Sequence, residues 1–188
     1  MIDIIDNDKI AEFLEANGIS HLSIEAIKQD ASNRRYFRIN NNKNTLLMDS
    51  PSIDNNNYEF IKISEHLNAI GLSAPKVIKR DHINGLFLIE DLGNLTFNEA
   101  IKNNIPEELL YKNAVHCLSK IHKSENPKNT PIYNNKYLLA ELSLFIEWFF
   151  KEIDIELDNA AIIKWEKVWN KALIEINKGN NKLVLRDF

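Results

Sequence analysis

The chain has 188 residues, of which 44% are hydrophobic, and its 23 Lys and Arg against 27 Asp and Glu give a net charge of −4 at pH 7. This length and composition suit one globular core, or one small lobe with part of a second, and exclude a disordered chain. Because nucleic acids and anionic lipids attract clustered basic residues, the acidic balance argues against both partners.

The first half of the sequence predicts an α+β arrangement. Asp6-Asn7-Asp8 offers helix caps before apolar residues at helical spacing, and Gly18 ends this first helix. Five segments with strand-like patterns follow, at residues 24–29, 36–39, 45–48, 76–80 and 86–90. An amphipathic helix is predicted between the third and fourth strands, over residues 55–70. We therefore expect an antiparallel meander, a helix and a β-hairpin.

The second half is predicted to be helical. Helices bounded by Pro, Asn, Asp or Gly are expected at residues 97–103, 106–122, 136–153 and 158–177. The pattern changes near Gly93, which predicts two domains, residues 1–92 and residues 93–188.

Cysteine usage and the N-terminus bear on the compartment. Cys117 is the only cysteine, which excludes an intrachain disulfide or a cysteine-built zinc site. The N-terminus has no basic region followed by an apolar core, so no signal peptide is predicted. No apolar run approaches the length of about 18 residues that spans a bilayer. We expect a cytoplasmic protein without a membrane partner.

Three segments carry polar residues where strands meet loops. The first, residues 30–38, contains no glycine, so its hydroxyl, amide and guanidinium groups would have to supply hydrogen-bond donors and positive charge to a bound anion. The second, residues 88–93, is an apolar strand that ends in Glu-Asp-Leu-Gly, and the third, residues 183–188, is an apolar run that ends in Arg-Asp-Phe. Taken singly, the first two can also be read as ordinary polar turns, and an Arg-Asp pair often arises by chance.

Taken in order, these segments resemble the kinase-like enzymes of the aminoglycoside-phosphotransferase family. The resemblance spans about residues 24–188 and is carried by Asp30-Ala31-Ser32-x-Arg34-Arg35-Tyr36-Phe37-Arg38, Met48-Asp49-x-Pro51, Gly71-Leu72-x-Ala74-Pro75, Leu88-Ile89-Glu90-Asp91-Leu92-Gly93, Glu141-Leu142-x-Leu144-Phe145-x-Glu147-Trp148 and Leu185-Arg186-Asp187-Phe188. The match is best to the bacterial branch that phosphorylates the anomeric hydroxyl of N-acetylmuramate and N-acetylglucosamine in cell-wall recycling.

The resemblance implies a protein-kinase-like two-lobed fold, with a five-stranded antiparallel small lobe and an incomplete helical large lobe. It implies an ATP-dependent kinase with a small sugar-like acceptor. Asp187 would be the catalytic base that takes the proton of the acceptor hydroxyl, and the main chain of Glu90 and Leu92 would bind adenine. The residues expected to bind the phosphates are Ser32, Asn33, Arg34 and Arg35.

The sequence departs from the family pattern in two places. The third strand has Met48-Asp49 near the position where protein kinases carry a phosphate-binding Lys, so Arg34 or Arg35 would supply that charge. The Asn and second Asp that hold Mg²⁺ would fall beyond Phe188, so no metal ligand is assigned and Mg²⁺ is expected only in a full-length member. These departures predict a truncated chain with little or no kinase activity of its own.

Other functions remain open. The chain would otherwise be a non-catalytic remnant that acts as a binding module and self-associates, or one half of a split enzyme completed by a C-terminal polypeptide. The acceptor would alternatively be an aminoglycoside, choline or a small alcohol.

A further site is predicted on the helix over residues 136–153. The apolar side chains of Leu142, Phe145, Trp148 and Phe149 share one helical face and are expected to pack in the core. Glu147 is polar, lies beside Trp148, and is predicted to bind substrate hydroxyl groups.

Overall fold

The computed structural model describes residues 7–21, 24–28, 33–40, 42, 44–50, 56–176 and 181–186. The chain divides into two compact units, Met1–Pro127 and Lys128–Phe188. This division falls after the expected domain boundary at residues 92 and 93, because the first two helices of the expected helical domain group with the sheet. A boundary between kinase lobes at that position stays a prediction.

A five-stranded antiparallel sheet forms the centre of the first unit, as the sequence predicted. Its strands are β1 (Ile24–Ala26), β2 (Arg35–Ile39), β3 (Thr45–Asp49), β4 (Val77–Asp81) and β5 (Leu86–Glu90). They lie in the order β1-β2-β3-β5-β4, so β5 rather than β4 pairs with the central β3. Helix α2 (Asn56–Ala69) connects β3 to β4.

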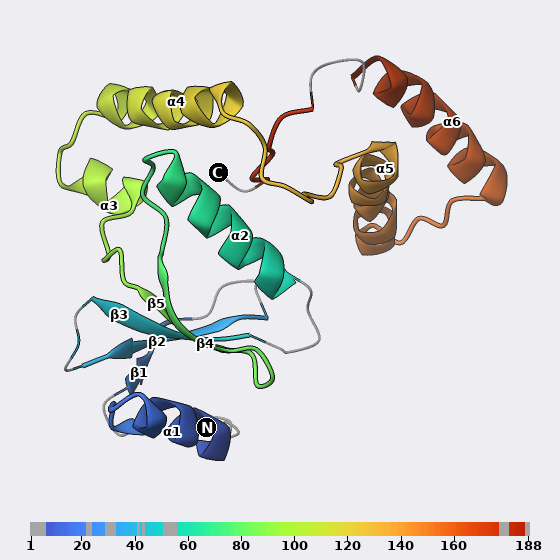
Figure 1. Cartoon of the computed structure of the whole chain (residues 1–188). Coiled ribbons are helices and arrows are strands. Elements are labelled where there is room, and N and C mark those ends of the chain that lie inside the picture. Colours follow the sequence, from blue (N-terminus) through green and yellow to red (C-terminus); the bar gives the residue numbers. More distant parts are fainter. Residues whose placement is uncertain are drawn as a thin grey trace. The chain divides into compact units, whose positions relative to one another are not determined.

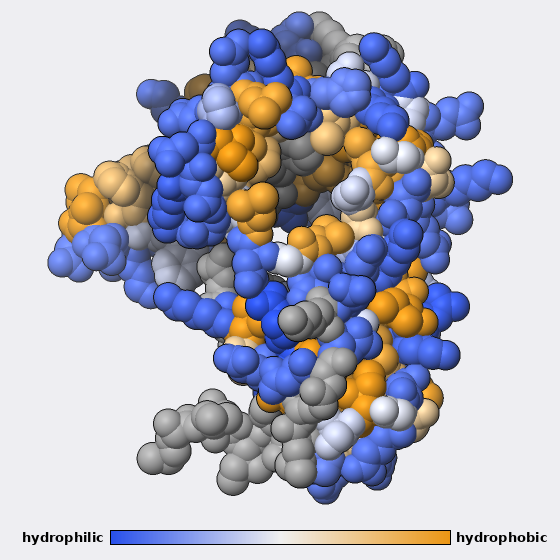
Figure 2. All heavy atoms as spheres, turned by 90° about the vertical axis from the view of Figure 1, so that its left-hand side faces the viewer, coloured by the Kyte–Doolittle hydropathy of each residue, from blue (hydrophilic) through white to orange (hydrophobic). Residues whose placement is uncertain are grey.

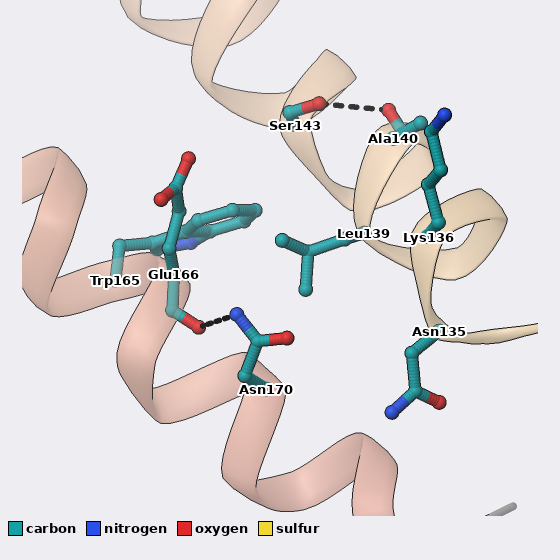
Figure 3. Close-up of a pocket in the computed structure, with 8 residues that line it drawn as sticks. All are labelled: Asn135, Lys136, Leu139, Ala140, Ser143, Trp165, Glu166 and Asn170. Atoms are coloured by element: carbon teal, nitrogen blue, oxygen red, sulfur yellow. Dashed lines mark hydrogen bonds between the residues drawn. The ribbon is translucent and has the colours of Figure 1, made fainter.

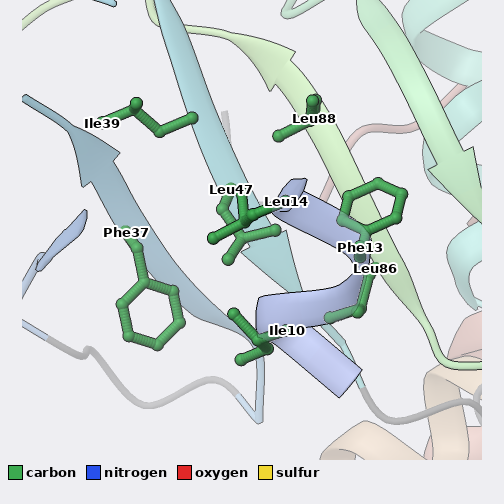
Figure 4. Close-up of a cluster of buried hydrophobic side chains, with 8 residues drawn as sticks. All are labelled: Ile10, Phe13, Leu14, Phe37, Ile39, Leu47, Leu86 and Leu88. Carbon is green, nitrogen blue, oxygen red and sulfur yellow. The ribbon is translucent and has the colours of Figure 1, made fainter. Parts of the chain in front are cut away.

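The two faces of this sheet are covered by different helices (Figure 1). Successive side chains of a strand point to opposite faces, so Leu47 and Met48 are both fully buried but in separate clusters. The cluster on the α1 (Asn7–Ala16) side consists of Ile10, Phe13, Leu14, Phe37, Ile39, Leu47, Leu86 and Leu88 (Figure 4). The cluster on the α2 side consists of Met48, Ile61, Phe87 and Ile89.

Helices α3 (Phe97–Lys102) and α4 (Glu107–Lys123) complete the first unit. The Thr96 hydroxyl caps α3 by accepting a hydrogen bond from the Glu99 N–H at 3.2 Å. The Lys120 Nζ of α4 donates to the Gly71 carbonyl, just beyond α2, at 2.9 Å. This contact connects the helical segment to the α+β half within the first unit.

The second unit contains α5 (Asn135–Leu144), η2 (Phe145–Phe150) and α6 (Asn159–Ile176). The sequence predicted one continuous helix over residues 136–153, but η2 is a π-helical turn. The rings of Phe145 and Phe149 stack with centroids 4.9 Å apart. The expectation that Phe145, Trp148 and Phe149 pack in the core is wrong for this structure, because their exposed fractions are 51%, 71% and 46%.

On the face drawn in Figure 2, the hydrophobic side chains form separate groups between hydrophilic ones. Within the described residues, no helix combines the length and the apolar character that a membrane span requires.

Candidate functional site

The connector that follows β5 presents main-chain groups beyond the end of this internal strand. The Glu90 N–H donates to the Lys76 carbonyl at 2.8 Å, and the Asp91 N–H donates to the Asn44 carbonyl at 2.9 Å. Among the described residues, nothing accepts a hydrogen bond from the Leu92 N–H, and the Leu92 side chain is exposed. Of these three N–H groups, only that of Leu92 has no acceptor among the described residues.

An ion pair braces this connector. The Asp91 side chain is only 5% exposed and accepts a hydrogen bond from the Arg38 Nε of β2 at 3.0 Å. Asp91 also accepts from the Gly93 N–H at 2.7 Å, and Gly93 has a φ of 84°, a conformation that a side chain would strain. Arg38 makes a second bond to the Asn94 side chain at 2.9 Å. The connector is therefore held in one conformation.

Replacement of Asp91 by alanine is expected to lower the free energy of unfolding by about 2–3 kcal/mol. Removing one partner of a buried ion pair costs about 3–5 kcal/mol, and the cost is smaller here because Arg38 is partly exposed and regains water. Urea unfolding measured by circular dichroism tests this. Glu99→Ala is the matched control, because it breaks an exposed pair with Lys102 that contributes less than about 1 kcal/mol. Equal effects of the two substitutions would contradict the prediction.

The segment expected to cover the phosphates is described in part. Ser32 lies outside the described residues, and Asn33 is exposed. The Arg34 guanidinium lies 5.2 Å from the centroid of the Phe60 ring on α2. Arg35 instead donates through Nε to Asp49, its partner in the β2–β3 register, at 2.8 Å.

These contacts distinguish Arg34 from Arg35, which the sequence analysis gave as equal candidates for binding the phosphates. Arg35 shares its strand face with Phe37 of the α1 cluster, and Asp49 neutralises its charge. Arg34 lies on the side of α2. If a phosphate binds on that side, Arg34 is the better placed of the two.

The position near which protein kinases carry a Lys is apolar here. Met48 is fully buried against Ile61 of α2. On α2 itself, Glu59 pairs with Lys62 of the same helix at 2.7 Å, and Glu65 is exposed. Neither carboxylate forms an ion pair with the described residues of β3.

In the second unit, Glu141 of α5 holds two side chains at once. Its Oε1 lies 2.5 Å from Nη2 of Arg186, and its Oε2 accepts a hydrogen bond from the Tyr133 hydroxyl. This hydrogen bond, together with partial burial, raises the pKa of Tyr133 above its ordinary value. Asp187, the predicted catalytic base, is the next residue along the chain from Arg186 and lies outside the described residues.

Glu147, the predicted substrate-binding residue, lies on η2 and is exposed, beside the exposed ring of Trp148. Single π-helical turns inside helices are often found at functional sites. A role for Glu147 in substrate binding stays a prediction.

A hollow of about 400 Å³ opens between α5 and α6 (Figure 3). It is lined by Asn135, Lys136, Leu139, Ala140, Ser143, Trp165, Glu166 and Asn170. On a helix with 3.6 residues per turn, Glu141 projects roughly opposite the residues of α5 that line this hollow. The hollow and the Arg186 contact therefore lie on opposite sides of α5, and the hollow is a separate feature from the predicted catalytic segment.

The metal-binding expectation can be compared only with the described residues. Within them, no group of three or more His, Cys, Asp or Glu side chains is arranged to hold a metal ion.

Known proteins similar to this chain include two curated kinases. It is 31% identical over 196 residues to an N-acetylmuramate/N-acetylglucosamine kinase of Caulobacter vibrioides, an alignment that covers 85% of this chain and 54% of that protein. A kinase of the same name from Pseudomonas aeruginosa is 29% identical over 141 residues, which cover 74% of this chain and 41% of that protein. The chain spans about half the length of these relatives.

A solved structure and a family profile extend the comparison. The streptomycin–ATP–APH(2″)-IIa ternary complex has a similar fold, with a TM-score of 0.61 and 14% identity over 96% of this chain and 62% of that chain. The profile of the phosphotransferase enzyme family matches residues 23–188. The kinase-like fold and the resemblance read from the motifs are thereby confirmed, and the chain belongs to the phosphotransferase enzyme family.

Proposed function

We propose that this chain provides the nucleotide-binding part of an ATP-dependent kinase that phosphorylates a cell-wall amino sugar such as N-acetylmuramate or N-acetylglucosamine. ATP supplies the phosphoryl group that such an enzyme transfers. The family assignment supports the reaction class, and the names of the two curated relatives support the acceptor.

The observation that carries the nucleotide proposal is the connector after β5. Adenine is recognised by main-chain donors and acceptors at the edge of an apolar pocket. The Leu92 N–H is available for this role, and the Arg38–Asp91 ion pair fixes the chain on either side of it. The Lys76 N–H donates to the Glu90 side chain at 3.3 Å and not to the Glu90 main-chain carbonyl. We assign this carbonyl as the hydrogen-bond acceptor for adenine.

The charge for the phosphates is assigned to Arg34 in this proposal, with Ser32 and Asn33 as further donors. Arg35 is the weaker candidate, because it pairs with Asp49 on the sheet face that carries the α1 cluster and not on the α2 side. A guanidinium group can form two parallel hydrogen bonds to a phosphate, which suits a loop without glycine.

Leu92→Pro is expected to weaken ATP binding roughly tenfold, because proline has no N–H and a lost hydrogen bond of about 1.4 kcal/mol corresponds to a factor of ten. Isothermal titration calorimetry with ATP measures this. Leu92→Ala is the matched control, since it keeps the N–H and shortens only an exposed side chain. If both variants bind ATP equally well, the Leu92 N–H does not bind adenine.

The complete proposal is tested by phosphoryl transfer. The purified 188-residue chain is incubated with ATP labelled in its γ-phosphoryl group and with N-acetylmuramate, kanamycin or choline. The chain is also assayed with a second polypeptide that carries the metal-binding segment of a curated relative. We expect ATP binding by the chain alone and transfer to the amino sugar only with the second polypeptide.

Other results would change the proposal in definite ways. Transfer by the chain alone would refute the expected inactivity, and transfer to kanamycin or choline would refute the acceptor. Absence of ATP binding would refute the nucleotide role and leave the non-catalytic binding module as the function.

A further inference from the structure

We propose that Glu141 and Tyr133 form a clamp that holds Arg186 and thereby positions the segment that leads to Asp187. Both are positioning residues, because neither is expected to touch ATP or the acceptor. The role in catalysis rests on the proposed phosphoryl transfer, whereas the clamp itself can be tested without it.

The first support is the use of both carboxylate oxygens of Glu141. One oxygen binds the guanidinium of Arg186 and the other accepts the hydroxyl hydrogen of Tyr133. Tyr133 lies just before α5, and its ring stacks on that of Tyr137, with centroids 6.3 Å apart. Glu141 is therefore held from two sides and presents its carboxylate to Arg186 in one orientation.

The second support is the backbone of Arg186. Its φ is 66°, in the left-handed region that non-glycine residues seldom adopt. Such a conformation costs free energy and persists only where its surroundings hold it. The ion pair with Glu141 stabilises this conformation of Arg186, the residue before the predicted base. Leu183 of the same segment is buried, with 6% of its surface exposed.

The clamp has a chemical consequence for the neighbouring carboxylate. A catalytic base must keep a lone pair for the acceptor hydroxyl. An adjacent guanidinium that paired with Asp187 would stabilise the charged carboxylate and weaken it as a base. By binding Arg186, Glu141 satisfies the charge of this cation, which then does not need to pair with a neighbouring carboxylate. Glu141→Gln is therefore expected to free Arg186 and disturb Asp187 without removing any ligand-binding group.

The clamp predicts a spectroscopic signature. The charged groups that face the Tyr133 hydroxyl are Glu141, which raises its pKa, and Arg186, which opposes this shift. In Glu141→Gln, the pKa of Tyr133 is expected to fall back toward the ordinary tyrosine value. NMR titration of ¹³C-labelled tyrosines measures this, and the resonance missing in Tyr133→Phe gives the assignment.

The second readout is the mobility of the segment. Amide hydrogen exchange in the peptide over residues 181–188 is expected to rise at least tenfold in Glu141→Gln. It should return toward the wild-type rate in Glu141→Asp, which restores the charge. The matched control is Glu152→Gln, an exposed carboxylate of the same unit, which should alter neither the exchange nor the Tyr133 titration.

A third readout concerns turnover. In a preparation that transfers phosphate, Glu141→Gln should lower kcat at least tenfold and leave the KM for ATP within twofold. An unchanged Tyr133 titration, unchanged exchange or unchanged kcat in Glu141→Gln would overturn the clamp. Failure of the wild-type chain to bind ATP would instead refute the proposed function, and the titration and exchange would still decide the clamp.

Discussion

Replacing Phe87 with alanine is expected to lower the free energy of unfolding of the first unit by about 3–5 kcal/mol. Phe87 is fully buried in the cluster between the sheet and α2, opposite Met48 in the β3–β5 register. Removing its ring leaves a cavity that β3 and α2 cannot fill without breaking their own contacts. The effect should reach the nucleotide site, because β5 ends at the connector that carries Leu92.

The measurement must report on the first unit. All three tryptophans lie in residues 148–169 of the second unit, so tryptophan fluorescence would follow the wrong part of the chain. Amide hydrogen exchange of peptides from β3 and β5 in increasing urea is the suitable probe. The matched control is Ile83→Ala, at a position that is 85% exposed, where a change within about 0.5 kcal/mol is expected. Equal protection in both variants would contradict the burial of Phe87.

The fold of the first unit was predictable because its signals are local. The strand pattern over residues 45–48 predicted β3, and the helical spacing of apolar residues over 55–70 predicted α2, which the structure gives as Asn56–Ala69. The hydrophobic periodicity of a strand or helix can be read from neighbouring residues alone. It therefore gave five strands and the helix between the third and fourth of them, although β1 ends at Ala26, earlier than the predicted end at residue 29.

The contacts of the candidate site were not predictable in the same way. Arg38 and Asp91 are separated by 53 positions, and their pairing depends on the register of two strands. The opposite directions of Arg34 and Arg35 follow from which of them is the first residue of β2, and sequence patterns place such ends poorly. Tyr133 carried no motif signal at all, because only the three-dimensional path of residues 181–186 brings Arg186 to the carboxylate that Tyr133 also binds.

Asp187→Asn is expected to lower kcat about 10²–10⁴-fold, the range that a positioned general base contributes. The substitution preserves size but replaces the charged carboxylate with a neutral amide, which cannot take the acceptor proton. The KM for ATP should change little, since the proposed adenine contacts lie in the other unit. Steady-state kinetics with labelled ATP and N-acetylmuramate measure this, under whichever condition the wild-type chain turns over, alone or complemented.

The control for this substitution is a second Asp→Asn change in the same unit. The Asp158 carboxylate accepts a hydrogen bond from the Ala161 N–H at 2.6 Å at the start of α6, and asparagine serves there almost as well. Asp158→Asn should therefore leave kcat and stability nearly unchanged. If Asp187→Asn retains wild-type kcat, Asp187 is not the base. If it instead lowers ATP affinity while kcat is kept, Asp187 acts in nucleotide binding, and the clamp of Glu141, Tyr133 and Arg186 positions a ligand-binding group rather than a base.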